Sequence, residues 1–209
     1  VDSIFSVTRN ASEINMEATE TVTKDIFTKI KVLDFPKIFQ CIDAPREMDE
    51  NLQRHSLNVA FTNGVIGQWL KLPEPVIKKL VCAGLVHDIG KTKELSLFPQ
   101  NDYTNDGQLL GHIMIGAEMV HDAAQKIDGF PQELENQLKH CILAHHGELE
   151  YGSPKKPAMV EAVALNLADN ADAKMETLTE LFDAAPAGNE WLGYNRFFES
   201  NIRRTGDFS

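Results

Sequence analysis

Apolar residues recur at helical spacing along most of the chain. The first series predicts an amphipathic helix over residues 11–33 with Ser12 as its N-terminal cap. Further helices are expected over residues 37–42, 48–70, 108–127 and 158–184. Two more begin at prolines, one at Pro73 that ends in the segment 81–91, and one at Pro131 that leads to His145. Alternation typical of strands is not found, so the sequence predicts an all-α fold, a multi-helix bundle.

The segments between these helices are polar or aromatic. Residues 92–107 and 148–157 are rich in turn-forming residues and predict loops. The tail after residue 184 is aromatic and should pack either on the domain or on a second subunit as a homodimer; it holds Trp191, Tyr194, Phe197 and Phe198. The 209-residue length favours a single domain, with a helical extension over about 1–46, a core over about 47–184 and the tail over about 185–209.

Composition narrows the function classes. The chain is 43% hydrophobic and 24% charged, as ordinary soluble proteins are, and it has no membrane span or signal segment, so a cytoplasmic location is expected. Cys41, Cys82 and Cys141 read as buried reduced thiols. The net charge of −11 argues against a broad nucleic-acid-binding face, although it does not exclude one small phosphate substrate.

One stretch, VCAGLVHDIGK at Val81–Lys91, carries unusual chemistry. An apolar helix there ends in His87 and Asp88, and Gly90 is expected to leave the helix in the left-handed conformation. A buried imidazole and carboxylate are costly unless something satisfies them. A metal ion would do so, and mixed nitrogen and oxygen donors suit Mn, Fe, Zn or Mg. Taken alone, a buried His-Asp pair is more often a structural hydrogen bond, so the rest of the chain must decide.

Other helices add residues of the same kind. Each alone has a structural explanation, such as a core histidine, a surface histidine or a helix-end imidazolium. Together they place ligand-type side chains at one end of several helices, which is how metal sites in helical bundles are built. The set comprises His55, His87, Asp88, His112, His145, His146 and Asp169. His121, which precedes Asp122, is expected on a solvated face and is left out.

The order His, His-Asp, His, His-His, Asp resembles the HD-domain metal-dependent phosphohydrolases, with HDIG at residues 87–90. YTNDGQLLGH at 103–112, ILAHHGELEYGSPKKP at 142–157 and LADNADAKM at 167–175 are similar to the YhaM-type 3′-to-5′ exoribonucleases of that superfamily. The resemblance implies one metal held by His55, His87, Asp88 and Asp169. It implies a second held by His112, His145 and His146, with Asp88 bridging.

Some features depart from those exoribonucleases. The segment before His55 reads APREMDENLQR where the relatives are rich in histidine and glycine, and Asn166 stands where they tend to have histidine. The relatives usually carry an N-terminal OB-fold domain for single-stranded RNA, and the segment before the first expected helix is too short to be expected to hold one. A small substrate is therefore an alternative.

Charged residues near the motifs suggest roles around a phosphate. Lys91 is placed to neutralise a phosphate oxygen, or it is a solvated surface lysine. Asp172 lies one turn after Asp169 and would orient a ligand or assist proton transfer, or it pairs with Lys174. Lys155 and Lys156 would hold a nucleotide tail, or they belong to a solvated loop.

The sequence thus predicts a metal-dependent phosphohydrolase that cleaves a phosphodiester such as a short single-stranded RNA 3′ end. One or two divalent ions of Mn, Fe, Co, Ni or Zn are expected, with Mg less natural. A phosphomonoesterase or nucleotidase acting on a small nucleotide is the first alternative. A non-catalytic sensing or interaction module with a structural metal is the second.

Overall fold

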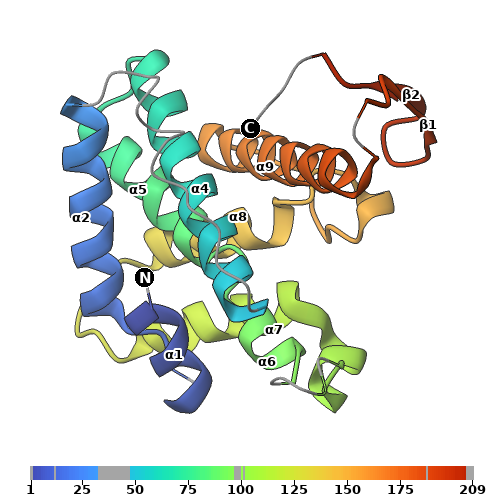
Figure 1. Ribbon diagram of the computed structural model, residues 1–209. Coiled ribbons are helices and arrows are strands. Elements are labelled where there is room, and N and C mark those ends of the chain that lie inside the picture. The colour runs from blue at the N-terminus through green and yellow to red at the C-terminus, as the bar shows by residue number, and fades with distance from the viewer. Residues whose placement is uncertain are drawn as a thin grey trace. The chain divides into compact units, whose positions relative to one another are not determined.

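The computed structural model describes residues 2–11, 13–32, 48–96, 100, 102–186 and 188–205. The chain divides into two compact units, Val1–Asn170 and Ala171–Ser209. The all-α prediction is confirmed, because helices make up nearly all of the regular structure (Figure 1). They are α1 (Asp2–Ala11), α2 (Met16–Val32), α4 (Met48–Trp69), α5 (Glu74–Val86), α6 (Lys91–Glu94), α7 (Asn105–Gln125), α8 (Gln132–Ala144), the 3-10 turn η2 (Leu149–Tyr151) and α9 (Val160–Ala184).

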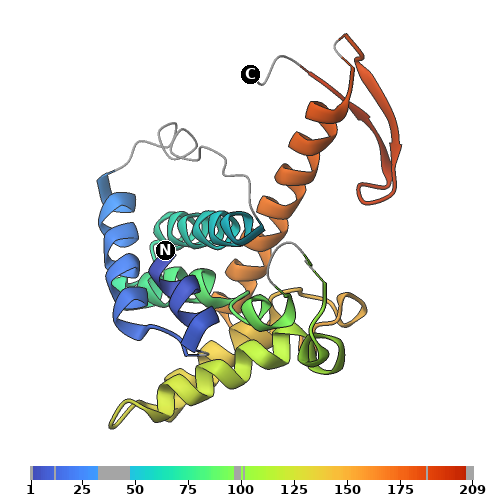
Figure 2. The same ribbon diagram turned by 60° about the horizontal axis from the view of Figure 1, so that its bottom comes forward.

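The core of the first unit is built around α5. This helix is apolar on most sides, and Leu80, Val81 and Leu85 are fully buried, as expected of a central helix. It packs against α4, α2 and α8, while α7 lies beside α8 (Figure 2). Gly64 on α4 permits close packing against α2, because a Cβ there would lie 2.1 Å from Ile30 Cδ1. The end of α5 is thereby fixed inside the bundle.

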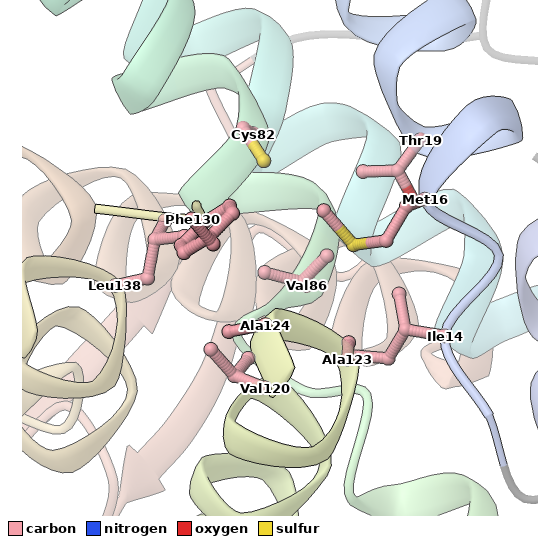
Figure 3. A pocket seen from close by; sticks show the side chains of 10 residues that line it. All are labelled: Ile14, Met16, Thr19, Cys82, Val86, Val120, Ala123, Ala124, Phe130 and Leu138. Carbon is pink, nitrogen blue, oxygen red and sulfur yellow. The ribbon is translucent and has the colours of Figure 1, made fainter. Parts of the chain in front are cut away.

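A small pocket in this core lies under the last turn of α5 (Figure 3). Its lining is apolar apart from Thr19 and Cys82. The apolar residues include Met16, Val86, Val120, Phe130 and Leu138. The pocket offers no charged group and therefore no evident chemistry of its own.

Several predicted elements differ from the structure in detail. The helix expected over 11–33 is observed as α2, and α1 before it was not predicted. The Asn15 side chain accepts a hydrogen bond from the Ala18 N–H at 3.0 Å at the start of α2. The predicted loop 92–107 contains most of α6 and the start of α7. Cys82 and Cys141 are free thiols; Cys141 is buried, as expected, and Cys82 is half-buried. The Ser12 cap, the helix over 37–42 and Cys41 lie outside the described residues.

The second unit corrects the expectation that the chain has no strands. It contains the antiparallel pair β1 (Trp191–Asn195) and β2 (Ser200–Arg203), with Tyr194 opposite Asn201. Most side chains of this ribbon are exposed on both faces, so it lacks the alternation that marks a half-buried strand. Tail packing on a second subunit stays a prediction. Among the described helices, none has the length and apolar character needed to cross a bilayer.

Candidate metal centre

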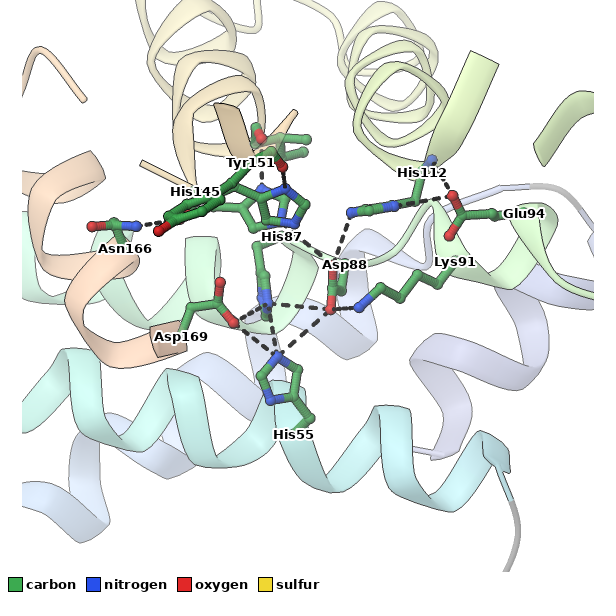
Figure 4. A network of polar contacts seen from close by, with 12 residues as sticks. His55, His87, Asp88, Lys91, Glu94, His112, His145, Tyr151, Asn166 and Asp169 are labelled. Atoms are coloured by element: carbon green, nitrogen blue, oxygen red, sulfur yellow. Dashed lines mark hydrogen bonds and ion pairs between the residues drawn. The ribbon is translucent and has the colours of Figure 1, made fainter. Parts of the chain in front are cut away.

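The seven predicted ligand residues come together in the first unit (Figure 4). His55 lies within α4 and Asp169 within α9, while His87 and Asp88 directly follow α5. His145 and His146 directly follow α8. His112 follows Gly111, whose φ of 73° interrupts α7 and redirects the chain. Helices that are distant in sequence therefore deliver ligand-type side chains to one place, some from their ends and some from within.

Glycine is required at position 90 for a different reason from the one that the sequence suggested. Its φ of −61° is right-handed, so the expectation of a left-handed exit from the helix is wrong. A Cβ at this position would lie 2.0 Å from the His112 carbonyl oxygen and 2.8 Å from the Gly116 nitrogen. Glycine is needed because the α7 main chain passes directly over it. This close approach brings His112 up to Asp88.

The first group of side chains surrounds one Asp88 oxygen. His55 Nε2 lies 3.2 Å from His87 Nε2 and 3.6 Å from Asp88 Oδ2. Asp169 Oδ1 lies 3.1 Å from His55 Nε2 and 3.8 Å from His87 Nε2. Two imidazole nitrogens and two carboxylate oxygens thus converge within the range that one cation could bridge.

The second group faces the other Asp88 oxygen. Ligand atoms of His112, His145 and His146 all lie within 4.8 Å of one another. Asp88 Oδ1 lies 3.6 Å from His112 Nε2 and 3.6 Å from His145 Nε2. Asp88 therefore stands between two histidine groups, with one oxygen toward each.

Four histidines direct their Nδ1 atoms away from this centre to acceptors. The ring Nδ1 of His87 lies 2.8 Å from Gly84 O, that of His145 2.7 Å from Ile142 O, and that of His146 2.9 Å from Tyr151 O. His112 Nδ1 lies 3.1 Å from Glu94 Oε1. An acceptor opposite Nδ1 fixes the proton there and leaves the Nε2 lone pair available for a metal.

Three buried atoms in the centre lack a hydrogen-bond partner: Asp88 Oδ1, His112 Nε2 and His145 Nε2. Such atoms are rare in folded proteins, because each costs about 1–3 kcal/mol. These three face one another, and a divalent cation would satisfy them all. The donor set of imidazole and carboxylate fits Mn, Fe, Co, Ni or Zn. The residues present therefore fit the metal that the sequence predicted.

Burial sets the protonation of the centre. It lowers the pKa of His87, and together with the nearby His87 it lowers the pKa of His145 to about 3. Burial alone would raise the pKa of Asp88, but His87 and Lys91 hold it well below its ordinary value. Burial opposes the charge of Lys91 as well, and Asp88 outweighs it and raises the lysine pKa. At neutral pH His87 and His145 are therefore neutral and Asp88 is ionised, which are the forms that bind metals.

The other predicted site residues lie in different settings. Lys91 joins the centre, since its Nζ is 2.6 Å from Asp88 Oδ2. Lys155 is exposed, and Lys156 is exposed and paired with Glu148. Asp172 is half-buried on α9 in the second unit. The catalytic role of Asp172 and the substrate-binding roles of both loop lysines stay predictions.

Sequence reasoning missed the residues that hold the ligands in place. Glu94 is buried and accepts a hydrogen bond from the His112 main-chain N–H at 3.0 Å. Asn166, noted only as a departure from the relatives, donates to the His145 carbonyl at 2.7 Å. His140, which was also not considered, does not belong to this group, since its Nε2 accepts the Ala158 N–H at 3.0 Å. Nothing in the KTKELS segment distinguishes Glu94 from a solvated acid.

Comparisons with known proteins agree with this arrangement. A family model described as HD domain matches residues 52–174, more than half of the chain. The chain is similar to proteins named 3'-5' exoribonuclease YhaM, with 41% identity to that of Shouchella clausii, 42% to that of Bacillus velezensis and 41% to that of Bacillus subtilis. Each alignment spans 112 residues, 53% of this chain and 35% of the relative.

The matched region contains every member of the predicted ligand set, from His55 on α4 to Asp169 on α9. The chain spans about a third of the length of the curated relatives it matches. No solved structure matches it. With a buried His-Asp pair at the end of its central helix and a family match over more than half its length, the chain belongs to the HD domain family.

Proposed function

We propose that this protein is a metal-dependent phosphohydrolase that removes nucleotides from the 3′ end of short single-stranded RNA. One observation carries the proposal: buried Asp88 directs one oxygen toward each of two histidine groups, and three of the atoms between them lack a partner. That arrangement suits one or two divalent cations. The similarity to proteins named 3'-5' exoribonuclease YhaM supports the choice of RNA.

In this reaction water adds to phosphorus, the P–O3′ bond breaks, and the departing 3′ oxygen takes up a proton. Bound cations would supply Lewis acidity, which makes water a better nucleophile near neutral pH and offsets charge on the phosphate. His55, His87, Asp88 and Asp169 would hold one cation, and His112, His145 and His146 a second. The surrounding protein fixes the orientation of these ligand side chains through the acceptors at their Nδ1 atoms.

Lys91 is proposed to contact a non-bridging phosphate oxygen. Its Nζ lies 2.6 Å from Asp88 Oδ2, and its side chain is 32% exposed, so it borders both the buried centre and solvent. Asp172, three residues after Asp169 on α9, is the proposed aid to proton transfer. Lys155 and Lys156 would contact the nucleotide chain further from the centre.

A nucleotidase acting on small nucleotides is the second candidate. The net charge of −11 favours it, because a long polyanion is repelled by an acidic protein more strongly than one phosphate is. A phosphomonoester needs the same cations and the same lysine. The two candidates therefore differ only in the substrate.

The test compares products from matched substrates. The Mn-loaded protein is incubated with a 5′-labelled short RNA, the same RNA circularised, and a mixture of mononucleotides. Progressive shortening of the labelled linear RNA with release of unlabelled nucleoside monophosphates, and no product from the circular RNA, would support the 3′-to-5′ exoribonuclease. Phosphate released from mononucleotides alone would support the nucleotidase. No product from any substrate would contradict both and leave the metal as structural.

Variants assign the activity to the site. His112→Ala and Asp88→Ala should abolish turnover with helical content retained. His121→Ala, on the same helix as His112 but outside the cluster, is the matched control and should keep full turnover. Turnover retained by Asp88→Ala would show that the reaction occurs elsewhere.

A further inference from the structure

The turn after the second ligand pair carries two large exposed side chains. Leu149 is 56% exposed and Tyr151 is 69% exposed, and both belong to η2. Scattered exposed aromatics are ordinary on protein surfaces. Tyr151 differs because its main-chain carbonyl lies 2.9 Å from the His146 Nδ1 atom (Figure 4). From standard backbone dimensions, its Cα therefore lies within about 5.3 Å of that nitrogen.

The main chain of η2 is held by its own hydrogen bonds. The Tyr151 N–H donates to Glu148 O at 3.1 Å, and the Gly152 N–H donates to Leu149 O at 3.0 Å. The Glu148 N–H donates to His146 O at 3.0 Å, which ties the turn to the ligand histidine. Gly152 closes the turn with a φ of 87°. The position of the Tyr151 Cα is thus fixed relative to His146, while its ring reaches into solvent.

We infer that η2 forms a nucleobase-binding subsite in which the Tyr151 ring stacks on the base of the nucleotide whose phosphate occupies the centre. This inference rests on the proposed function, because it requires a nucleotide phosphate at the histidine cluster. Tyr151 lies on the Nδ1 side of His146, opposite the Nε2 atom, so its exposed ring would meet the base of a nucleotide that extends from the centre past His146. Stacking tolerates any base, since every base has a π-face.

The subsite is tested by equilibrium binding, using AMP and ribose 5-phosphate with the Mn-loaded protein. The two ligands share the phosphate and ribose and differ only in the base. Tyr151→Ala should weaken AMP binding by roughly 5- to 150-fold, the effect of losing one aromatic stacking partner. Ribose 5-phosphate binding should stay unchanged. Tyr151→Phe should retain AMP binding, because stacking needs the ring and not the hydroxyl.

The matched control is Tyr194→Ala, which removes a tyrosine that is 65% exposed on β1. It should leave both affinities unchanged. Chromatography verifies that AMP is intact, and if it is hydrolysed the same comparison is made with the KM values of the two compounds. Equal affinity of the native protein for both ligands, an unchanged preference in Tyr151→Ala, or no binding of AMP would each overturn the subsite.

Failure of the subsite is distinguishable from failure of the proposed function. If linear RNA is degraded but Tyr151→Ala keeps the preference for AMP, the exoribonuclease stands and the subsite falls. If RNA is not degraded but the preference depends on Tyr151, the subsite stands and belongs to a protein that binds small nucleotides.

Discussion

One carboxylate oxygen of Glu94 contacts His112 twice, at 3.0 Å from its main-chain N–H and at 3.1 Å from its ring Nδ1. A carboxylate oxygen in this position favours a ring proton on Nδ1, which leaves the Nε2 atom, on the Asp88 side, for a metal. Glu94 comes from α6 and His112 from α7, which makes the contact between these two helices part of the metal centre.

Glu94→Ala should therefore weaken metal binding about 10- to 100-fold, the usual effect of losing a residue that orients a ligand. Glu94→Gln keeps an acceptor oxygen of the same reach and should lose less. Competition with a chelator of known affinity measures both. Unchanged affinity in Glu94→Ala would show that packing alone orients the imidazole.

Gly90 and Gly116 face each other across the contact between the end of α5 and α7, and they make a matched pair. A Cβ on Gly90 would meet the main chain of α7 at 2.0 Å, whereas the nearest atoms to a Cβ on Gly116 are 3.5 Å away. Gly90→Ala should destabilise the fold by about 3 kcal/mol or more, because main chain cannot rotate away. Gly116→Ala should be neutral or stabilise by up to about 1 kcal/mol, because alanine favours helix. Urea unfolding distinguishes them, and equal effects would contradict the close approach.

Gly90 illustrates what the sequence alone could not predict. The HDIG motif identified the metal centre, but a glycine after a helix suggests a left-handed turn. Only the path of α7 reveals that Gly90 is needed for packing. The histidines and aspartates were predictable because their chemistry is rare in apolar helices, and helical periodicity placed α4, α5, α8 and α9. Glu94 was not predictable, because its contact with His112 depends on how α6 and α7 pack together. The β1–β2 ribbon was not predicted, because most of its side chains are exposed and its sequence therefore lacks the alternation of a half-buried strand.

A second contact joins α7 to α8 and predicts a pH dependence. His121 Nδ1 lies 2.7 Å from Glu135 Oε1, and this hydrogen bond lowers the pKa of the carboxyl below its ordinary value of 4.5. The unfolded chain then takes up a proton at higher pH than the folded chain does. The stabilisation is complete above about pH 4.5 and is lost as the pH falls through the lowered pKa of the folded state.

His121→Ala should reduce the free energy of unfolding near neutral pH and flatten its decline on acidification. Urea unfolding at a series of pH values measures both. Gln125→Ala removes the neutral partner that lies 3.4 Å from Glu135 Oε2 and should leave the slope unchanged. If the free energy of unfolding falls equally steeply with decreasing pH in the native protein and in His121→Ala, other carboxyl groups cause the loss of stability in acid.

Lys91 allows metal binding to be separated from turnover. Its ammonium lies 2.6 Å from Asp88 Oδ2 and repels any cation bound to that carboxylate. Lys91→Met should therefore bind metal as tightly as the native protein or more tightly. If the lysine contacts a phosphate oxygen, turnover should still fall about 100-fold, as when one stabilising donor is removed from an active site. Asp88→Asn should lose both properties together. Metal titration and single-turnover kinetics on both variants measure the two effects separately.

Weaker metal binding in Lys91→Met would make the lysine a structural partner of Asp88. Undiminished turnover in the same variant would show that the lysine does not contact the phosphate.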